Sequence, residues 1–494
     1  MNCCVNQVRH GLFLDSVVLM QVSRTVAALP GVEDAALMMG TPANQEILEN
    51  SGLLVPDGES AGGGDLIVAI RAEDETAATA AMDQAVLLLD QPAAVRAASA
   101  AVQPRTLRSA LRVDPNANLA LISVPGDFAA AEARKALRAG LHVMIFSDNV
   151  SLDDEIALKL EARQRELLVM GPDCGTAILG GIPLAFANHV PVGDIGIIGA
   201  SGTGIQEVSC LIAQAGAGIS HAIGVGGRDL SDEVGGISTL TALEWLESDP
   251  KTRHIVLLSK PPSAAVVERI SAELDHSRKS FTVCFLGAED LPLPANAVVA
   301  RTLRAAAASA SGFQEDTSGG TGLARPLAGE RKWVRGFFSG GSLAAEAQVI
   351  FLDQGIRVTS NAPIQGAHAL SEVTAGHTLL DLGDDQYTRG RPHPMIDPAV
   401  RDDPLRQALH DPTVGAVLLD IVIGYGASED PAAHVARILG HHGNRDPVVI
   451  ASVTGTEEDP QVLSRQVSIL DSAGVWVRPS NAAAAEAALA CIAA

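Results

Sequence analysis

The last third of this chain, from about residue 331 to 494, repeats in the same order the segments of residues 191–290. RGFFSGGSLAAEAQVIF matches GIIGASGTGIQEVSCLI, and both predict a strand, a Gly/Ser turn and a helix. Three more segments of the later copy correspond, in the same order, to segments of the earlier copy. TLLDLGDDQYTRGRPHP corresponds to AIGVGGRDLSDEVGG, AVLLDIVIGYG to HIVLLSKPPS, and PVVIASVTGTEED to FTVCFLGAED. Such a series indicates an internal duplication. Because strands alternate with helices, each copy is expected to form a parallel α/β sheet, and the two Gly/Ser turns to face one site across a pseudo-twofold axis.

Two further α/β regions precede the duplication. From residue 118 to 176, apolar strand-length runs alternate with amphipathic segments, which predicts a parallel βαβαβ unit. Ligands of such sheets collect at the carboxyl ends of the strands, here the loops VPGD, FSDN and GPDCGT. Residues 10–90 predict an ACT-like or ferredoxin-like module, followed by a linker at 91–117. Its strands are predicted at 10–15, 32–40 and 65–72, and its helices at 16–29 and 74–90.

The charge balance excludes several kinds of partner. The chain has 35 Lys and Arg against 58 Asp and Glu, a formal net charge of −23 at pH 7. Such a chain lacks the basic face that nucleic acid or an anionic membrane requires. Aromatic residues make up only 3%, which disfavours stacking platforms for bases. We therefore expect small-molecule ligands.

The six cysteines predict neither a disulfide framework nor a metal site. No CxxC pair and no HExxH spacing occurs. The N-terminus MNCCVNQVRHGLF has no basic segment followed by an apolar run, and the sequence has no run of about 18 apolar residues. These features predict a cytoplasmic protein with buried, reduced thiols.

The Gly/Ser turns are candidate anion sites. GASGTG at 199–204 follows a strand and opens a helix, so its backbone N–H groups and the helix dipole favour a phosphate or carboxylate. SGGS at 339–342 repeats this arrangement, and IGYG at 423–426 is a third turn that precedes a helix. An ordinary tight turn is the alternative for each. The predicted phosphate-binding residues are Ser201, Gly202, Thr203, Gly204, Gly340, Gly341, Ser342, Gly424 and Gly426.

Four side chains form the predicted catalytic set. Lys260 ends an apolar strand and precedes two prolines, where its charge can hold a phosphate or carboxylate. Arg389 and Arg391 carry planar forks suited to bidentate anion recognition. His393 stands between two prolines and is predicted to carry a proton. The alternatives are an exposed lysine and a rigid surface turn whose arginines pair with nearby aspartates.

A weaker prediction concerns substrate binding by Arg228, Asp229 and Cys174. Arg228 and Asp229 occupy, in the first copy, the loop that corresponds to the arginine-rich loop of the second. Cys174 in GPDCGT is a candidate thiol nucleophile, although no histidine or other base flanks it and packing is the alternative.

These segments resemble a known family. VPGDFAAAEARKALRAGLHVMIFSD, GPDCGT and GIIGASGTGIQEVSCLIAQAGAGISHAIGVGGRD resemble the α-subunit of succinyl-CoA synthetase and related acyl-CoA synthetases. GFFSGGSLAAEA, GHTLLDLGDDQYTRGRPHPMIDP and LLDIVIGYGASEDP resemble, more narrowly, the FdrA proteins. The resemblance implies the following domains: an ACT/ferredoxin-like module (1–100), a Rossmann-like CoA-binding-type domain (101–190), a flavodoxin-like CoA-ligase-type domain (191–306), a linker (307–330) and a second flavodoxin-like CoA-ligase-type domain (331–494).

The chain departs from the synthetases in three respects. FLGAEDLPLPANAVVA has no histidine where the synthetases carry a phosphohistidine, no ATP-grasp domain is present, and the Gly-rich CoA turn before NLALISV is missing. The FdrA resemblance implies instead a carbamoyltransferase of the oxamate type, working with a second, unrelated subunit. Its reaction converts a ureido acid such as oxalurate, with phosphate, to carbamoyl phosphate and an amide.

This carbamoyl transfer is the function predicted first, with phosphate or carbamoyl phosphate as substrate, no cofactor required, and a homo-oligomer expected. One alternative is a subunit of an NDP-forming acyl-CoA synthetase that binds CoA at VPGD and GPDCGT. The other is a non-catalytic scaffold or regulatory subunit. Both alternatives stay open at the level of the sequence.

Overall fold

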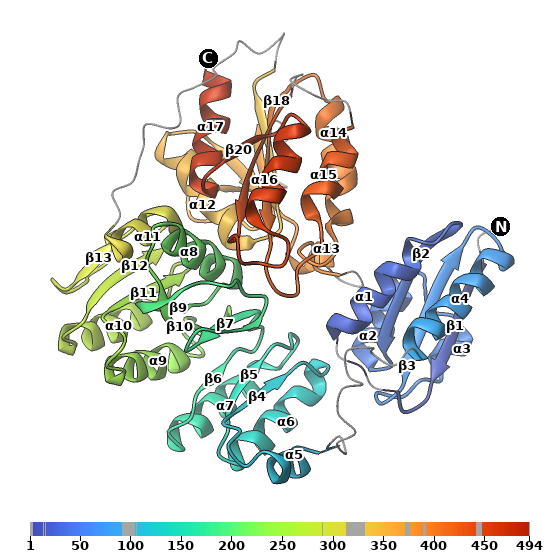
Figure 1. Ribbon diagram of the computed structural model, residues 1–494, viewed down its shortest axis with the longest axis horizontal. Coiled ribbons are helices and arrows are strands. Elements are labelled where there is room, and N and C mark those ends of the chain that lie inside the picture. The colour runs from blue at the N-terminus through green and yellow to red at the C-terminus, as the bar shows by residue number, and fades with distance from the viewer. Residues whose placement is uncertain are drawn as a thin grey trace. The chain divides into compact units, whose positions relative to one another are not determined.

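The chain forms two compact units. The computed structural model describes residues 3–12, 14, 16–90, 104, 106–288, 290–312, 331–370, 376–388, 392–440 and 447–493. The first unit comprises Met1–Asp154 with Asp385–Pro392, and the second comprises Glu155–Asp384 with His393–Ala494. The second unit contains the duplicated domains and is the one that concerns the site (Figure 1).

The first unit begins with a three-stranded antiparallel sheet in the order β1-β3-β2. Helices α1 and α4 pack against one face and α2 and α3 lie on the other, so both faces are covered. The ferredoxin-like prediction is therefore confirmed in outline. The elements are β1 (Cys3–Arg9), α1 (Ser16–Ala27), β2 (Val32–Met39), α2 (Pro42–Asn50), α3 (Pro56–Glu59), β3 (Leu66–Ala72) and α4 (Glu75–Asp90).

Two predictions for this unit were wrong. The strand expected at residues 10–15 does not form there, and the first strand of the chain is instead the preceding segment, β1. The chain turns after β1 because Gly11 takes a positive φ of 66° and donates its N–H to Asp65. Part of the expected linker 91–117 is helical, since Thr106 and Ser109 form a capping box at the start of α5 (Leu107–Val113).

The other elements are β4 (Leu119–Ile122), α6 (Gly126–Arg138), β5 (His142–Ile145) and α13 (Asp385–Thr388), and β4 pairs with β5 in parallel as predicted.

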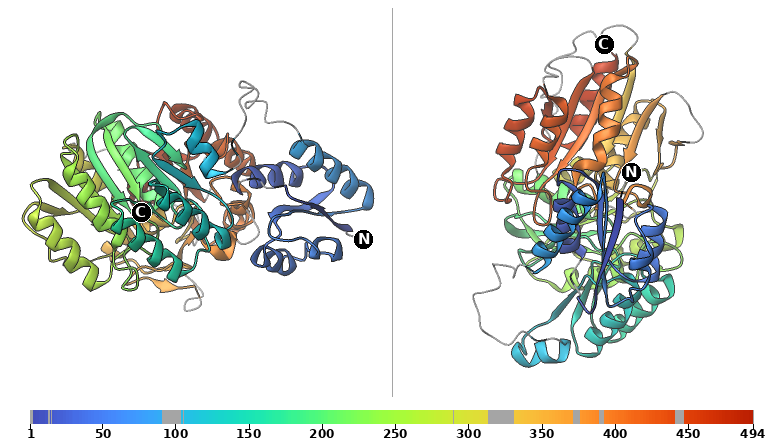
Figure 2. Two further views of the ribbon diagram at one scale, coloured as in Figure 1. Left: turned by 90° about the horizontal axis from the view of Figure 1, so that it is seen from below. Right: turned by 90° about the vertical axis from the view of Figure 1, so that its right-hand side faces the viewer.

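The second unit holds two seven-stranded sheets with helices on both faces (Figure 2). The first sheet has the order β13-β12-β11-β9-β10-β7-β8 and the second β16-β15-β17-β14-β18-β19-β20. The first copy and the segment before it comprise α7 (Leu152–Gln164, which begins in the first unit), β6 (Val169–Met170), β7 (Thr176–Leu179), β8 (Ile182–Ala185), β9 (Val192–Gly199), α8 (Gly202–Gln214), β10 (Ile219–Gly224), α9 (Ile237–Ser248), β11 (His254–Ser259), α10 (Ala264–His276), β12 (Ser280–Phe285), β13 (Ala297–Val299) and α11 (Leu303–Ser311). The second copy comprises β14 (Trp333–Phe338), α12 (Gly341–Asp353), β15 (Val358–Ser360), β16 (His368–Ala369), β17 (His377–Asp381), the 3₁₀ helix η2 (Pro398–Arg401), α14 (Asp402–His410), β18 (Val414–Val422), α15 (Pro431–Leu439), β19 (Val448–Thr454), α16 (Leu463–Ser472), β20 (Trp476–Arg478) and α17 (Asn481–Ala493).

The sheet orders confirm the duplication over five strands. β13-β12-β11-β9-β10 corresponds to β20-β19-β18-β14-β17, and all neighbours within each series are parallel. The copies differ at the remaining edge, where the first adds the β7–β8 hairpin antiparallel to β10 and the second adds two parallel strands. The predicted linker 307–330 begins too early, because α11 continues to Ser311. Residues 313–330 lie outside the described part.

The two copies are joined by reciprocal helix caps. Glu207 of α8 accepts the N–H of Asn481, the first residue of α17, at 3.0 Å. Glu346 occupies the same position in α12 and accepts the N–H groups of Leu303 and Arg304, which open α11, at 2.6 and 3.2 Å. Asn481 Nδ2 donates to Glu346 at 2.7 Å. Each copy therefore supplies the carboxylate that caps the last helix of the other, and the N–H groups at each helix start are satisfied across the interface.

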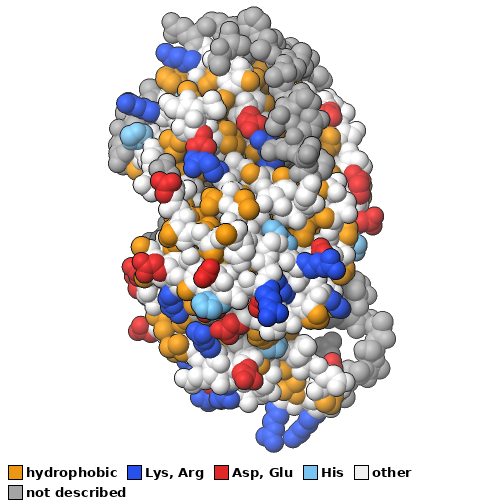
Figure 3. All heavy atoms as spheres, turned by 90° about the vertical axis from the view of Figure 1, so that its left-hand side faces the viewer, with side chains coloured by type: hydrophobic (Ala, Val, Ile, Leu, Met, Phe, Trp, Pro, Cys, Tyr) orange, Lys and Arg blue, Asp and Glu red, His pale blue; other side chains and the backbone are white. Residues whose placement is uncertain are grey.

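The described helices and one face of the surface give two further observations. No helix within the described ranges has both the length and the apolar character needed to cross a membrane. On the face in Figure 3, basic and acidic side chains are interspersed and do not gather into regions of one sign.

We predict that Asn481→Ala destabilises the second unit by about 1–3 kcal/mol, because it leaves buried acceptors on Glu346 and Leu343 without their donor. Thermal unfolding measures this loss. Glu486→Ala on the same helix is the control: it removes an ion pair with Arg304 in which the Glu486 side chain is 50% exposed, worth less than about 1 kcal/mol. Equal shifts in the two variants would contradict the capping role.

Candidate functional site

The Gly/Ser turns of the two copies meet, as the duplication predicted. A Cβ added at Gly204 would lie 3.4 Å from Ser342 Oγ, and one added at Gly340 would lie 2.6 Å from Thr203 Oγ1. The second distance is too short for any side chain at Gly340. The amino-terminal ends of α8 and α12 are thus packed against each other, and two helix dipoles present their positive ends at one place.

Only part of this meeting point is accessible. Thr203, Ser342 and Gly340 are buried, whereas Ser201, Gly202 and Gly341 are partly exposed. The accessible residues belong to both turns, so an anion bound there would contact both copies. The buried members of the predicted phosphate set hold the turns together and are not positioned to meet a ligand directly.

A carboxylate of the chain itself occupies part of the second turn. Asp420, at the equivalent of Leu258 in the first copy, accepts the N–H groups of Ser339 and Gly340 at 2.8 and 3.0 Å. Arg401 donates to Asp420 Oδ1 and to Ser339 Oγ, each at 2.7 Å. The Gly340 amide is therefore committed to Asp420, and Gly341 is the accessible residue of this turn.

Asp381 is a site residue that the sequence pattern did not single out. It ends β17, and its carboxyl lies beside the first residue of α12, because a Cβ built on Gly341 would be 2.6 Å from Asp381 Oδ2. Burial raises the pKa of Asp381 to about 6, and the nearby charge of Lys260 opposes this rise. The exposed Lys260, predicted from the first copy, is thus close to a carboxyl of the second. A register argument between the two copies could have found Asp381.

His393 lies beside the same loop, but its protonation state differs from the one that the prediction requires. Its Nδ1 accepts the N–H of Met395 at 3.2 Å, so the ring hydrogen is on Nε2, which faces Gly383. Burial lowers the pKa of His393 to about 4, and the ring is neutral at pH 7. His393 is therefore placed to donate a hydrogen bond and is not a base in this arrangement. Its predicted companions Arg389 and Arg391 lie outside the described residues.

The third predicted turn does not open a helix. Gly424 donates its N–H to Gln461 Oε1 and accepts from Gln461 Nε2, so its polar groups are satisfied within the protein. Helix α15 begins later, at Pro431, with the side chain of Asp430 as its cap. The structure leaves no room for a side chain at Gly426, since a Cβ there would be 2.8 Å from the ring of Phe186. The phosphate-binding role predicted for Gly424 is corrected accordingly.

The predicted substrate-binding pair Arg228 and Asp229 is held in a structural ion network. Asp229 is fully buried, receives Lys159 Nζ at 2.7 Å, and caps α9 through the N–H groups of Ser238 and Thr239. Arg228 forms an ion pair with Glu155 at 2.8 Å, and Glu155 also binds Lys159. Because Asp229 is enclosed, the substrate-binding prediction for it was wrong.

Cys174 is likewise enclosed. The residue is 2% exposed, and burial raises the pKa of its thiol to about 12. Nucleophilic attack requires a thiolate, so this thiol is inert and the packing alternative holds.

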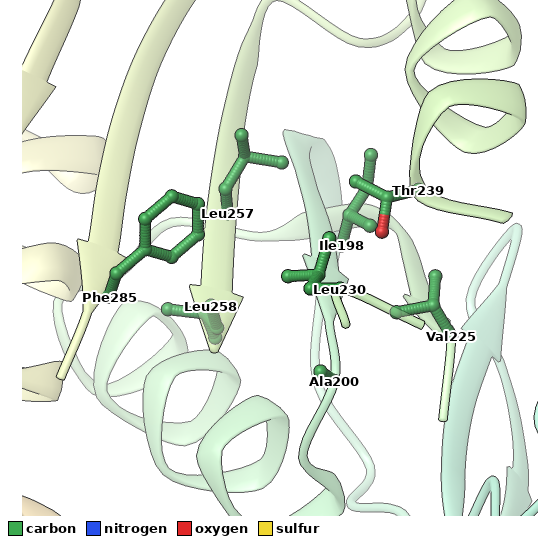
Figure 4. A pocket seen from close by; sticks show the side chains of 8 residues that line it. All are labelled: Ile198, Ala200, Val225, Leu230, Thr239, Leu257, Leu258 and Phe285. Atoms are coloured by element: carbon green, nitrogen blue, oxygen red, sulfur yellow. The ribbon is translucent and has the colours of Figure 1, made fainter. Parts of the chain in front are cut away.

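An apolar crevice in the first copy is a separate feature (Figure 4). It lies between β9, β11 and the start of α9, on the sheet face opposite α8. Of its eight lining residues only Thr239 is polar, and its hydroxyl already donates to Asp229 at 2.7 Å, so the lining side chains leave no donor for an anion. The lining residues are Ile198, Ala200, Val225, Leu230, Thr239, Leu257, Leu258 and Phe285. We regard it as a packing gap and not as the site.

Family models match three stretches of the chain. These are "AllF, heavy metal-associated domain" at residues 1–104, "CoA binding domain" at 192–285 and "CoA-ligase" at 337–491. The second match covers the first sheet of the duplication, whereas the predicted CoA-binding-type domain was 101–190; the domain boundaries stay a prediction. Fold and matches together define a protein of the CoA-ligase class.

Sequence relatives narrow this class. The chain is 39% identical to the uncharacterized protein YahF of Escherichia coli K12 over 96% of both chains. It is 26% identical to succinate–CoA ligase subunit alpha 1 of Archaeoglobus fulgidus, over 36% of this chain and 61% of that one. It is 28% identical to the sulfoacetate-CoA ligase subunit SauD of Bilophila wadsworthia, over 36% and 62%. The chain belongs to the FdrA family of succinyl-CoA synthetase α-subunit-like proteins.

The heavy metal in the name of the first model does not suit the residues of this module. Cys3 and Cys4 are neighbours on β1, so their side chains point to opposite faces of the sheet. Cys4 Sγ lies 3.5 Å from the carbonyl of Leu53, and burial raises the pKa of its thiol. The described residues contain no group of three or more His, Cys, Asp or Glu that could hold a metal ion.

We predict that EDTA leaves the melting temperature of the protein unchanged and that added Zn²⁺ does not raise it, because a stable zinc site needs several converging ligands and the described residues bring no such group together. Differential scanning calorimetry tests both. A chelator-induced loss of stability that Cys3→Ser abolishes would overturn this assignment.

We also predict that Arg401→Ala destabilises the second unit by about 3–5 kcal/mol, because Asp420 then remains buried without its counter-ion. Thermal unfolding measures the change. Arg406→Ala is the matched control, since the Arg406 side chain is 53% exposed and its ion pairs are worth less than about 1 kcal/mol. A loss no larger than that of the control would show that Asp420 does not need the arginine.

Proposed function

We propose that this chain is a subunit of a CoA-ligase-class enzyme that makes or consumes an acyl phosphate where α8 meets α12. The observation that carries the proposal is the convergence of two helix N-termini with Ser201, Gly202 and Gly341 on the accessible side. Free N–H groups at such ends bind phosphate. Lys260, close to Asp381, adds a positive charge beside the same place.

The first candidate activity is an NDP-forming acyl-CoA ligase reaction, with a partner subunit that supplies the nucleotide-binding domain. It is supported by the relatives named as CoA ligase subunits, of which the chain spans less than two thirds. In such a reaction the acid is activated as an acyl phosphate, and the thiol of CoA then displaces phosphate. The chain's own contribution would be to hold the phosphoryl group between the two turns and to stabilise its charge.

A second candidate is carbamoyl transfer between a ureido acid, such as oxalurate, and phosphate. The observation that favours it is the sequence LGAEDLPLPANAVVA at 286–300, which follows β12 and contains no histidine to carry a phosphoryl group. Direct attack of phosphate on a carbamoyl carbon needs an anion cradle and a positioned proton carrier but no phosphohistidine. Phosphate would then be the substrate and no nucleotide would be consumed.

The discriminating experiment is a pair of assays on the purified full chain, alone and with the subunit that co-purifies from its own cells. One mixture contains ATP, CoA and a carboxylic acid, and ADP and thioester are measured. The other contains phosphate and oxalurate or another ureido acid, and carbamoyl phosphate is measured. Thioester formation supports the ligase, and carbamoyl phosphate without nucleotide supports the transferase. Activity of the complex that survives Ser201→Ala with Lys260→Ala would leave the chain a scaffold.

We predict that Lys260→Ala weakens phosphate binding about tenfold, because one charge-assisted contact is lost. Isothermal titration with phosphate measures the dissociation constant. Lys251→Ala removes the same charge from an exposed lysine that precedes β11, at the opposite end of that strand, and should leave the constant unchanged. Equal weakening in both variants would mean that only net charge matters and that Lys260 holds no ligand.

A further inference from the structure

Besides Asp420, whose counterpart in the first copy is Leu258, the second copy has a further carboxyl next to the site that the first copy lacks. In the second copy Asp381 is the last residue of β17 and pairs with Phe338. The equivalent position in the first copy, paired with Gly199, is Gly224. At this pair of positions a carboxyl stands on the α12 side and a glycine on the α8 side, so the pseudo-symmetry is broken at this residue.

The carboxyl of Asp381 is held in a fixed place. Asn361 brackets its backbone, accepting the Asp381 N–H and donating to the Asp381 carbonyl, each at 2.9 Å. Gly383 donates its N–H to Oδ1 at 3.0 Å, and Oδ2 lies against the Cα of Gly341. With Asp381 only 7% exposed, the group cannot turn into solvent. A carboxyl so constrained beside a helix N-terminus is placed for a reaction at that end of α12.

The surroundings of Asp381 suit proton transfer. The pKa of Asp381 is raised to about 6, chiefly by burial. The hydrogen bond from the Gly383 N–H and the charge of Lys260 after β11 oppose the rise, whereas Asp384 on the same loop and Asp420 on β18 contribute to it. A carboxyl with a pKa near neutrality exchanges protons efficiently at physiological pH. His393, which also lies beside this loop, is neutral and keeps its hydrogen on Nε2. It therefore supplies a fixed donor and leaves proton exchange to Asp381.

We propose that Asp381 is the residue that carries the proton between nucleophile and leaving group during acyl transfer at the α8–α12 site. The proposal rests on the proposed function. In thioester formation, the carboxylate takes the proton of the thiol while the C–S bond forms, and returns it to the phosphate oxygen as the C–O bond breaks. In carbamoyl transfer, it takes the proton of hydrogen phosphate while the C–O bond forms, and gives it to the amide nitrogen as the C–N bond breaks. Neither route consumes a further reactant.

The first test measures proton uptake and does not depend on turnover. A bound dianion raises the pKa of a neighbouring carboxyl, so the protein should take up protons when it binds an anion at pH values from about 6 to 7. Sulfate is the probe, because it does not itself titrate in this range. Calorimetric titration in buffers of different ionisation enthalpy gives the number of protons taken up. We expect uptake by the wild type and by Asp403→Asn, a charge-matched control whose side chain is 85% exposed on α14, and none by Asp381→Asn.

The outcomes separate this proposal from the one on which it rests. Sulfate binding by the wild type without proton uptake would overturn the role of Asp381 and leave the anion site standing. If neither sulfate nor phosphate binds, both proposals fail. Because the wild-type measurement is decisive, the test holds even if Asp381→Asn does not fold.

The second test uses whichever activity the assays establish. Asp381→Asn should lower kcat on the order of 10²–10⁴-fold with a small change in KM for phosphate or acyl phosphate, the loss typical of a missing general acid–base. It should also abolish the limb of the pH–rate profile near pH 6, a change that a merely structural role would not produce. An unchanged profile in an active Asp381→Asn variant would overturn the proposal.

Discussion

The exchange of helix caps between the two copies is the contact on which the geometry of the site depends. Glu207 and Glu346 lie about one and a half turns into α8 and α12. The carboxylate of each accepts a hydrogen bond from a backbone N–H at the start of a helix in the other copy. Burial raises the pKa of both carboxyls, that of Glu346 to about 7, and the nearby charge of Glu207 adds to the rise at Glu346. Such groups are stable only where donors meet them, so the interface has one favourable arrangement, and that arrangement brings the amino-terminal ends of α8 and α12 together.

The duplication gives two equivalent Gly/Ser turns, but the side chains around the two turns differ. In the second copy Asp420 binds the Ser339 and Gly340 amides and Arg401 neutralises it, so an internal salt bridge replaces a ligand at that turn. In the first copy the counterpart of Asp420 is Leu258, whose side chain cannot accept a hydrogen bond, and Ser201 and Gly202 are partly exposed. Under the proposed function, the accessible residues of the two turns form one shared anion site. This fits a reaction that handles a single phosphoryl group between a cation from one copy and a carboxyl from the other.

The sequence was most informative where local pattern and tertiary role coincide. The repeated strand–turn–helix order of GASGTG and SGGS predicted both the duplication and the meeting of the turns, because equivalent elements related by a pseudo-twofold place equivalent ends together. It was least informative about side chains whose partners are distant in sequence. Asp229 was predicted to be a loop residue available to substrate, yet it is buried and paired with Lys159, which lies seventy positions earlier in the chain. His393 looked like a proton carrier, but the Met395 amide fixes its tautomer and burial removes its basicity.

The sequence by itself determined the class of fold, the duplication and the family, because these follow from hydrophobic period, turn composition and the order of recurring segments. Only the tertiary structure decided which polar groups remain free. Hydrogen-bond donors at a helix end are available to a ligand only if no side chain of the protein reaches them first. A sequence does not reveal that Asp420 binds the Ser339 and Gly340 amides of the second turn, whereas its counterpart beside the first turn is Leu258. The same holds for Asp381, whose carboxyl lies beside Gly341 although the two residues are forty positions apart in the chain.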